Sequence, residues 1–411
     1  MRLLYSFGIR LYQIGVYVAS LWNPKAKQMV HGWQRFFEKI PTERIEQGRT
    51  AWFHASSLGE FEQARPVLER FKKMHPDYTI CLTFFSPSGY EVRKDYKEAD
   101  FVCYLPMDTC HNAREFVRLI NPTVAFFVKY DFWFNYLHEL EKHKVPTYIF
   151  SAIFRQDQYF FKSYGRWFRN QLGCFTHIFV QNRESEELLH HFRGVTHCSV
   201  AGDTRFDRVH EIAQTAKQFP EIETFVDNKP VLMVGSSWEP DEVHIKRFVD
   251  TYRGDFKLIL APHVISESHL ESIEKLFGKD KCVRYTEIAT PNLQDRQVLI
   301  INNFGMLSSL YQYARVAIIG GGFGQGIHNI LEALTFGKPV VFGPNYGKFQ
   351  EAKDILARGG GFTYRESEQL IEQLTLWFDN EDAYQKASKS CLDYVAENLG
   401  ATEEILSIVK L

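Results

Sequence analysis

Residues 316–345 read VAIIGGGFGQGIHNILEALTFGKPVVFGPN and join two short apolar runs through a glycine-rich loop and an amphipathic stretch. The runs 316–320 and 339–343 predict buried strands, because short apolar stretches bounded by glycine or proline are typical of parallel sheets. The amphipathic stretch between them predicts a helix that the glycine-rich loop enters. A strand, a glycine-rich loop, a helix and a second strand form the repeating unit of a doubly wound α/β sheet.

The same alternation of apolar runs and amphipathic stretches extends over most of the chain in two sets. The first set predicts strands at 51–55, 79–85, 101–105, 124–128, 147–151 and 177–181. The second set predicts strands at 231–235, 257–261, 298–302, 316–320 and 339–343. We therefore expect an α/β protein with two facing Rossmann-like, doubly wound domains. Ligands of such sheets bind beyond the carboxyl ends of the strands, so motifs at strand ends matter most.

The domain boundaries follow from this pattern and from the length of 411 residues, which suits two or three domains. Segment 206–228 is polar without a strong strand signal, so it predicts a linker. The N-terminal Rossmann-like domain then covers 23–205, after a hydrophobic segment at 1–22. The C-terminal Rossmann-like domain covers 229–385, and helices at 386–411 could pack back on the N-terminal domain.

The composition excludes several classes of protein. With 45% hydrophobic and 24% charged residues, the chain is neither wholly disordered nor a polytopic membrane protein. The 48 Lys and Arg against 50 Asp and Glu leave no basic field of the kind that binds nucleic acid. The seven dispersed cysteines contain no Cys-x-x-Cys pair, which argues against a disulfide framework and fits a reducing compartment.

Motifs that are missing narrow the chemistry further. The chain has no G-x-x-x-x-G-K-[ST], no H-E-x-x-H and no G-x-S-x-G, and its glycine run does not fit G-x-G-x-x-G. It also lacks the Asp-x-Asp pair with which many sugar-nucleotide enzymes hold a divalent metal. We therefore expect no bound metal and no cofactor.

Residues 1–22 form an apolar, aromatic segment that Arg2 and Arg10 interrupt. The uninterrupted stretch from Leu11 to Trp22 is shorter than the roughly 20 residues of a transmembrane helix. Tyrosine and tryptophan settle at headgroup depth, and basic residues favour anionic lipid on the cytoplasmic side. The segment therefore predicts an anchor in the membrane interface, and a helix docked on the protein's own core stays open as the alternative.

The first polar motif, His54-Ala-Ser56-Ser57-Leu-Gly59-Glu60, follows the strand predicted at 51–55 and enters a helix. Ser57 and Glu60 have the spacing of a capping box, in which the glutamate would satisfy a backbone N–H. Alternatively, a carboxylate at this strand end could be a general base for an attacking hydroxyl. Gly59 would allow a substrate to approach the backbone closely.

The second motif is the loop from Gly320 to Gly326 with His328, Asn329 and Glu332 after it. Free N–H groups in such a loop favour an anion such as phosphate. The spacing of four places His328 and Glu332 on one face of the helix that the loop enters, with Glu332 available to ribose hydroxyls. A tight turn with an ordinary exposed helix pair is the alternative.

The third motif is the polar patch Lys129-Tyr-Asp131-Phe-Trp133-Phe-Asn135, which follows the strand predicted at 124–128. Its position at a strand end favours a binding role, and a packed loop is the alternative.

In their order along the chain, these motifs resemble one family, the 3-deoxy-D-manno-oct-2-ulosonic acid (Kdo) transferases of lipopolysaccharide synthesis, glycosyltransferase family 30. The resemblance covers essentially the whole chain and starts with the hydrophobic amino terminus. Its further motifs are His54 to Glu60, Trp133-x-Asn135, Gly202-Asp-Thr-Arg205-Phe-Asp207, Gly235-Ser-Ser-Trp-Glu-Pro-Asp-Glu242, and Gly320 to Glu332 with Gly343-Pro344.

The resemblance implies a metal-independent GT-B glycosyltransferase at the cytoplasmic face of the bacterial inner membrane. Such an enzyme moves Kdo from CMP-Kdo to a hydroxyl of the lipid A precursor, lipid IVA, with inversion at the anomeric carbon. CMP-Kdo, the lipid A precursor and inner-membrane lipid are therefore the implied partners, and Glu60 is the implied base.

The resemblance also implies where each substrate binds. The implied donor-binding residues are Ser236, Ser237, His263, Gly321, Gly322, Gly324, Gly326, His328, Asn329 and Glu332. The implied acceptor-binding residues are Ser56, Ser57, Gly59, Lys129, Asp131, Trp133, Asn135 and Arg205.

The chain departs from the family pattern at two positions. Lys129 stands where many relatives have glutamate, so Asp131 could take over the carboxylate role. Pro262-His263-Val264 replaces the frequent Pro-Arg-His, which removes one expected cation. Two other functions stay open: a GT-B enzyme with another nucleotide sugar, such as a UDP-sugar transferase or an epimerase, and a non-catalytic membrane-bound sensor of sugar nucleotides.

Overall fold

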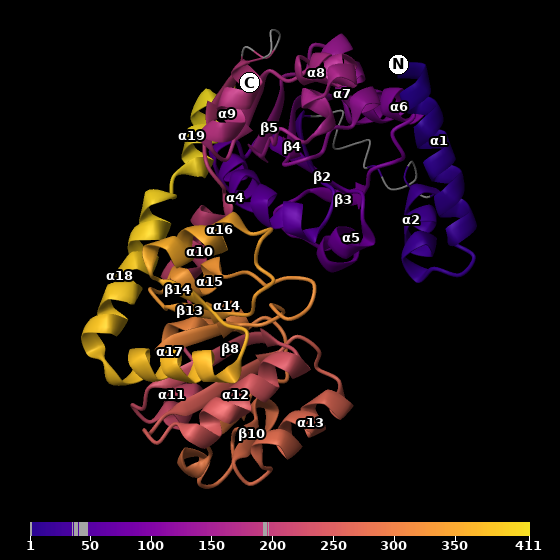
Figure 1. Ribbon diagram of the computed structural model, residues 1–411. Helices are drawn as coiled ribbons and strands as arrows, with labels where there is room; N and C mark the ends of the chain where they lie inside the picture. Colours follow the sequence, from indigo (N-terminus) through magenta and orange to yellow (C-terminus); the bar gives the residue numbers. More distant parts are fainter. Residues whose placement is uncertain (1, 35, 37–39, 41–47, 192–194, 196) are drawn as a thin grey trace. The chain divides into compact units, whose positions relative to one another are not determined.

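The computed structural model describes residues 2–34, 36, 40, 48–191, 195 and 197–411. The chain divides into two units, each with its own parallel sheet (Figure 1). Unit 1 holds the residues up to Arg208 together with Leu399–Leu411, and unit 2 holds Val209–Asn398.

The sheet of unit 1 has seven strands in the order β3-β2-β1-β4-β5-β6-β7, all paired in parallel. All six strands predicted for this part of the chain are confirmed, and the edge strand β7 was not predicted. The strands are β1 (Arg49–Ala55), β2 (Tyr78–Phe84), β3 (Phe101–Tyr104), β4 (Pro122–Val128), β5 (Thr147–Ala152), β6 (His177–Val180) and β7 (Cys198–Val200).

Helices cover both faces of this sheet. Since successive strand residues point to opposite sides, each strand contributes side chains to a core on either face. Trp52 and Phe127 belong to one core, and Phe53 and Phe126 belong to the other. The helices are α1 (Arg2–Ala19), α2 (Pro24–Gln34), α4 (Leu58–Met74), α5 (Pro87–Arg93), α6 (Cys110–Ile120), α7 (Phe134–Lys142), α8 (Arg166–Leu172), α9 (Arg183–His190), α10 (Arg205–Gln214) and α19 (Ala401–Ile408), with single 3₁₀ turns at Tyr159–Phe161 and Ser163–Gly165.

Unit 2 repeats the arrangement with the strand order β10-β11-β9-β8-β12-β13-β14. All five predicted strands are confirmed, whereas the three-residue strands β10 and β14 were not predicted. The strands are β8 (Val231–Ser237), β9 (Lys257–Pro262), β10 (Cys282–Arg284), β11 (Val298–Ile300), β12 (Val316–Ile319), β13 (Val340–Phe342) and β14 (Gly361–Thr363).

The helices of unit 2 include one that is shorter than the sequence predicts. The segment after the glycine-rich loop becomes helical only at Leu331, so His328 lies in irregular chain and shares no helix face with Glu332. The helices are α11 (Pro220–Val226), α12 (Glu239–Thr251), α13 (Glu267–Phe277), α14 (Leu307–Leu310), α15 (Leu331–Leu334), α16 (Gln350–Arg358), α17 (Ser367–Asp379) and α18 (Glu381–Glu397), with 3₁₀ turns at Tyr285–Glu287, Leu293–Asp295 and Tyr311–Tyr313.

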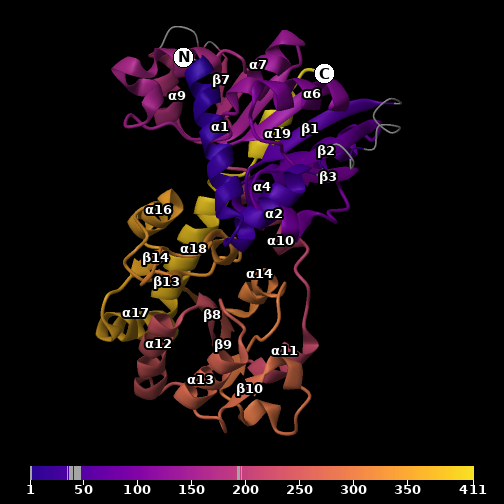
Figure 2. The same cartoon turned by 90° about the vertical axis from the view of Figure 1, so that its right-hand side faces the viewer.

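The chain crosses between the units twice, once within α10 and once after α18. The predicted linker 206–228 is largely helical, and Ile222 and Phe225 of α11 are fully buried. After the second crossing, α19 lies beside α4 and adds Ile405 and Leu406 to the core of unit 1 (Figure 2). The Asp207 carboxylate fixes the start of α19, since it accepts the N–H groups of Gly400 and Thr402 at 2.7 Å each.

The two amino-terminal helices lie side by side against unit 1 (Figures 1 and 2). Val16 of α1 is buried together with Val30 and Trp33 of α2, and the Tyr5 hydroxyl donates to Asp108 at 2.6 Å. The docked-helix alternative is therefore correct for one face of α1. No helix in the described ranges has the length and the apolar character needed to cross a membrane.

Replacing Asp207 by alanine should loosen the carboxyl-terminal helix from unit 1. Its carboxylate makes two charge-assisted hydrogen bonds at the start of α19, and loss of such a cap costs about 1 kcal/mol. We expect Asp207→Ala to lower the free energy of unfolding by about this amount in denaturant titrations. Asp207→Asn retains one acceptor oxygen and should lose less. Equal stability of all three proteins would contradict the capping role.

Candidate active site

Each sheet has one point where the strand order reverses direction. In unit 1, β1 lies between β2 and β4, and in unit 2, β8 lies between β9 and β12. The connections that leave the two central strands turn to opposite sides there, which opens a crevice beyond their carboxyl ends. In unit 1 the first and third motifs follow β1 and β4. In unit 2 the second motif follows β12, and Trp238 to Glu242 follow β8.

Glu60 lies in the first turn of α4, directly after β1. Ser57 is the N-cap residue of this helix, but its side chain makes no capping hydrogen bond and instead donates its hydroxyl to the Glu60 carboxylate. The predicted capping box is therefore not formed. Glu60 is partly exposed, and Gly59 beside it is exposed. The carboxylate is thus accessible at the switch point of unit 1.

Asp131 is the second carboxyl group at this switch point, because it follows β4. Its side chain is buried and accepts both the hydroxyl and the backbone N–H of Ser56, the latter at 3.1 Å. Burial raises the pKa of Asp131 to about 8, and the charge of Glu60 adds to the rise. Two carboxyl groups in different environments therefore lie together, one accessible and one buried with its proton retained at neutral pH.

The remaining predicted acceptor residues fall into three places. Lys129, in the left-handed conformation at φ 58°, and Trp133 lie next to Asp131 along the chain. Asn135 is fully buried in a different cluster, where its side chain donates to the Asp108 carbonyl at 2.7 Å. The Arg205 guanidinium is paired with Asp203 at 2.8 Å. Of these residues, only Lys129 and Trp133 therefore extend the site around Glu60.

The loop from Gly320 to Gly326 in unit 2 needs glycine where its backbone packs directly against other backbone segments. A Cβ atom at Gly320 would lie 2.1 Å from the Ser236 carbonyl oxygen, and one at Gly322 would lie 2.5 Å from the backbone nitrogen of Gly343. The Asn345 side chain also donates to the Gly324 carbonyl at 2.8 Å. These contacts hold the loop against the ends of β8 and β13.

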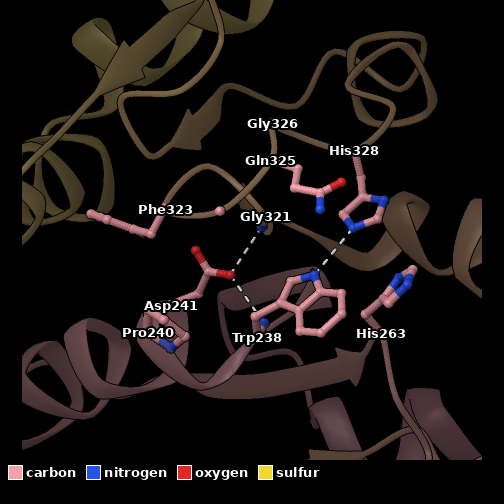
Figure 3. A pocket seen from close by; sticks show the side chains of 10 residues that line it. Trp238, Pro240, Asp241, His263, Gly321, Phe323, Gln325, Gly326 and His328 are labelled. Carbon is pink, nitrogen blue, oxygen red and sulfur yellow. Dashed lines mark hydrogen bonds between the residues drawn. The ribbon is translucent and has the colours of Figure 1, made fainter.

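A cavity of about 480 Å³ lies between this loop and the start of α12 (Figure 3). In the described part of the chain, the backbone N–H groups of Gln325 and Gly326 in its wall have no protein acceptor. Such free N–H groups suit an anion. The cavity is lined by Trp238, Pro240, Asp241, His263, Gly321, Phe323, Gly324, Gln325, Gly326 and His328.

Three rings form one wall of this cavity (Figure 3). The ring of His263 stacks on Trp238 and on His328, with centroids 4.6 Å apart in each pair. The Trp238 indole N–H also faces the His328 Nε2 atom at 3.4 Å, so this nitrogen is the acceptor. Burial lowers the pKa of His328, and neighbouring His263 adds to this effect, so both favour the neutral ring.

Asp241 forms the floor of the cavity between the loop and α12 (Figure 3). Its Oδ2 atom accepts the backbone N–H groups of Trp238 and Gly321 at 3.0 Å each. Its Oδ1 atom is buried and has no hydrogen-bond partner among the described residues. Burial raises the pKa of Asp241. An unpaired buried oxygen at a cavity floor suits a ligand hydroxyl or amine.

Half of the predicted donor-binding residues line the cavity. Those that line it are His263, Gly321, Gly324, Gly326 and His328. Those outside its lining are Ser236, Ser237, Gly322, Asn329 and Glu332. Ser237 is fully buried and donates to Glu242 at 2.8 Å, and Glu332 accepts the Asn329 side chain at 3.1 Å.

Sequence reasoning missed Trp238 and Asp241 as cavity residues. Both belong to the motif Gly235 to Glu242, and the signal available was their place directly after a predicted strand. In the parts of the chain that the structure describes, no three His, Cys, Asp or Glu side chains gather as a metal site would need.

Comparisons with known proteins agree with this geometry. Over 87% of this chain and 98% of the other, the structure resembles UDP-GlcNAc 2-epimerase from Neisseria meningitidis, with a TM-score of 0.62 and 16% identity. This likeness concerns the fold, and the predicted GT-B architecture of two Rossmann-like units is confirmed. The family model described as 3-deoxy-D-manno-octulosonic-acid transferase (kdotransferase) matches residues 31–208.

Two relatives align over nearly the whole chain. The 3-deoxy-D-manno-octulosonic acid transferase of Aquifex aeolicus is 28% identical over 83% of this chain and 89% of its own length. That of Rickettsia conorii is 25% identical over 90% of this chain and 81% of its own length. The protein is therefore a glycosyltransferase. Its sequence is similar to Kdo transferases over most of its length.

The variant Asp131→Asn tests whether Asp131 stays protonated in the folded protein. The pKa of this group lies near 8 in the folded chain and near 3.8 in the unfolded one, so between these values only the folded chain keeps the proton. The contribution of Asp131 to the free energy of unfolding therefore falls as the pH rises through this window, and the asparagine variant lacks this loss.

We expect the stability of Asp131→Asn relative to the unchanged protein to increase from about pH 5 to about pH 8.5, measured by denaturant unfolding at both values. Asp157→Asn, at an exposed aspartate, is the matched control. A constant or decreasing difference for Asp131→Asn would contradict a protonated Asp131.

Proposed function

We propose that this protein transfers Kdo from CMP-Kdo to a hydroxyl of the lipid A precursor, with inversion at the anomeric carbon. The observation that carries the mechanism is the position of Glu60. Its carboxylate stands at the switch point of unit 1, is accessible, and does not cap its own helix.

In this mechanism Glu60 acts as the general base. A sugar hydroxyl is a weak nucleophile until its proton is removed, and a positioned base contributes roughly 10²–10⁴ in rate. The acceptor proton goes to the Glu60 carboxylate while the acceptor oxygen forms a bond to the anomeric carbon. The bond from that carbon to the phosphate oxygen of CMP breaks, and CMP leaves with the electron pair. A single displacement of this kind inverts the anomeric centre and needs one base.

The donor is assigned to the cavity of unit 2. The phosphate and the Kdo carboxylate are anions, which suit the N–H groups of Gln325 and Gly326 and the imidazoles of His263 and His328. The hydroxyl-rich Kdo ring suits the free oxygen of Asp241. CMP leaves as an anion that hydrogen-bond donors stabilise, so neither a metal ion nor a catalytic acid is part of the proposal.

The other functions weighed from the sequence are less well supported. A nucleotide-sugar epimerase shares the fold, but the relatives that align over most of the chain are transferases. A non-catalytic sensor needs Glu60 only as a helix cap, and Glu60 has no such role here.

The function is tested by mass spectrometry of the lipid product. We expect incubation of the protein with CMP-Kdo and lipid A precursor to add the mass of Kdo to the lipid, whereas UDP-sugars in place of CMP-Kdo should add nothing. An unchanged lipid with CMP-Kdo, or a product with a UDP-sugar, would overturn the proposed function.

Glu60→Gln should abolish transfer but leave donor binding intact. The amide keeps the size of the side chain and removes the base, so we expect turnover to fall about 10²–10⁴-fold. CMP affinity, measured by calorimetry, should stay unchanged because the cavity belongs to unit 2.

The matched control for this variant is Glu62→Gln. Glu62 lies on the same helix and is paired with Arg93 at 3.0 Å. It should keep normal turnover. Transfer by Glu60→Gln at the rate of this control would reject Glu60 as the base.

We also propose that the protein acts at the cytoplasmic face of the inner membrane, on which the outer face of α1 lies. Apolar side chains at helical spacing are exposed along α1, and Leu3 is 88% and Leu21, just after the helix, 82% exposed. An apolar helix face of this kind lies in the membrane interface at headgroup depth. The exposed apolar residues of this segment are Leu3, Leu4, Phe7, Leu11, Tyr12, Ile14, Tyr17, Val18, Leu21 and Trp22.

The double variant Leu11→Glu, Val18→Glu should detach the protein from vesicles of phosphatidylethanolamine and phosphatidylglycerol. Both side chains are about half exposed, so the fold tolerates the change, but charges at this depth oppose insertion. We expect the fraction that cosediments with vesicles to fall about 10-fold or more. Leu376→Glu, at a similarly exposed leucine on α17, is the control and should bind as before. Equal binding of both variants would contradict the membrane face.

A further inference from the structure

Four polar side chains are buried inside the aromatic core of unit 1, behind the switch point. Trp52, His54 and Thr83 are fully buried, and Asp131 is 6% exposed. Trp52 and Thr83 belong to neighbouring strands, β1 and β2, and no sequence motif drew attention to them. A buried polar group lowers the stability of the fold unless it is hydrogen-bonded. The hydrogen-bond partners of these four side chains therefore indicate their role.

The first link runs from Trp52 to Thr83. The Trp52 Nε1 atom lies 2.8 Å from the Thr83 hydroxyl oxygen. An indole N–H only donates, so the hydroxyl oxygen is the acceptor. The hydroxyl proton then has two candidate acceptors, the His54 Nδ1 atom at 2.8 Å and the Phe53 carbonyl at 3.4 Å. The shorter distance indicates that Thr83 donates to His54.

The second link fixes the tautomer of His54. If Nδ1 accepts from Thr83, the proton of the neutral ring is on Nε2, and burial keeps the ring neutral by lowering its pKa to about 3. The Nε2 atom faces the Ser56 hydroxyl oxygen at 3.5 Å and an Asp131 oxygen at 4.0 Å. Because the Ser56 proton already goes to Asp131, the Ser56 oxygen is left as an acceptor that suits an N–H.

The chain of donors therefore ends at the residues around the candidate base. Ser56 donates its hydroxyl and its backbone N–H to Asp131. The next residue, Ser57, donates to Glu60. A change in the orientation of His54 would shift the Ser56–Asp131 pair and the loop that carries Ser57.

We propose that Thr83 and His54 are positioning residues for the transfer reaction: Thr83 holds His54 in the Nε2–H tautomer, and His54 in turn orients the Ser56–Asp131 pair beside Glu60. This inference rests on the proposed function for its kinetic consequence. Neither Thr83 nor His54 needs to touch a substrate, because they act through the hydrogen bonds of the residues in front of them.

Thr83→Val is the variant that tests the proposal, since it keeps the shape of the side chain and removes the hydroxyl. We expect kcat to fall about 10- to 100-fold, because small misplacements of reacting groups cost this much. The KM for CMP-Kdo should stay unchanged, because the donor cavity belongs to unit 2. Thr83→Ser restores the hydroxyl and should restore kcat. Thr79→Val makes the same change elsewhere on β2 and is the matched control.

Nitrogen-15 NMR of the imidazole groups gives a readout that does not depend on activity. The His54 signal is assigned by its loss in His54→Asn. We expect the Nε2–H tautomer in the unchanged protein and a mixture of tautomers in Thr83→Val.

The two measurements separate the possible failures. Normal kcat in Thr83→Val, or an Nδ1–H tautomer in the unchanged protein, would overturn the proposed positioning. If Thr83→Val does not fold, the tautomer in the unchanged protein and the kcat of Thr83→Ser still decide the matter. If the unchanged protein transfers no Kdo, the proposed function fails, and the tautomer alone decides whether the hydrogen-bond chain exists.

Discussion

Each of the two sheets reverses its strand order once, between β1 and β4 in unit 1 and between β8 and β12 in unit 2. The rest of the structure depends on these two reversals. Parallel strands need crossover connections. At β1 and at β8, the connection from the central strand and the connection from its neighbour turn to opposite sides of the sheet. At each such point, irregular chain carries polar groups past the end of a buried sheet. Glu60 and Asp131 lie at the carboxyl end of the unit 1 sheet for this reason, and Trp238, Asp241 and the glycine-rich loop lie at that of unit 2 for the same reason.

The strands could be predicted because their physics is local. A central strand of a parallel sheet is buried on both faces, so its apolar run is visible without any knowledge of its neighbours. The three strands that were missed have three residues each, and β7 is half-buried at the edge of its sheet. The backbone of β10 and β14 is likewise paired on one side only. Such strands form because a neighbour is already in place, and the sequence alone does not show that neighbour.

The site could be predicted less completely, because its geometry depends on contacts between distant segments. The spacing of four between His328 and Glu332 predicts a shared helix face, but this segment stays irregular until Leu331, and the His328 N–H instead bonds the Gly320 carbonyl at 3.2 Å. The spacing of Ser57 and Glu60 fits a cap equally well as a base, and only the hydrogen bonds distinguish the two. Trp238 and Asp241 belong to the motif Gly235 to Glu242, but the sequence does not show that the start of α12 directs them into the cavity.

The return of α19 to unit 1 has a consequence for the order in which the protein is made. Ile405 and Leu406 complete the core around Phe53 and Phe71, and the Tyr148 hydroxyl contacts the backbone of Lys410. These residues leave the ribosome after the whole of unit 2. During synthesis, when amino-terminal domains usually fold first, unit 1 must therefore keep an open apolar surface until α19 has emerged. The second unit, although it starts later, is the first that can be finished.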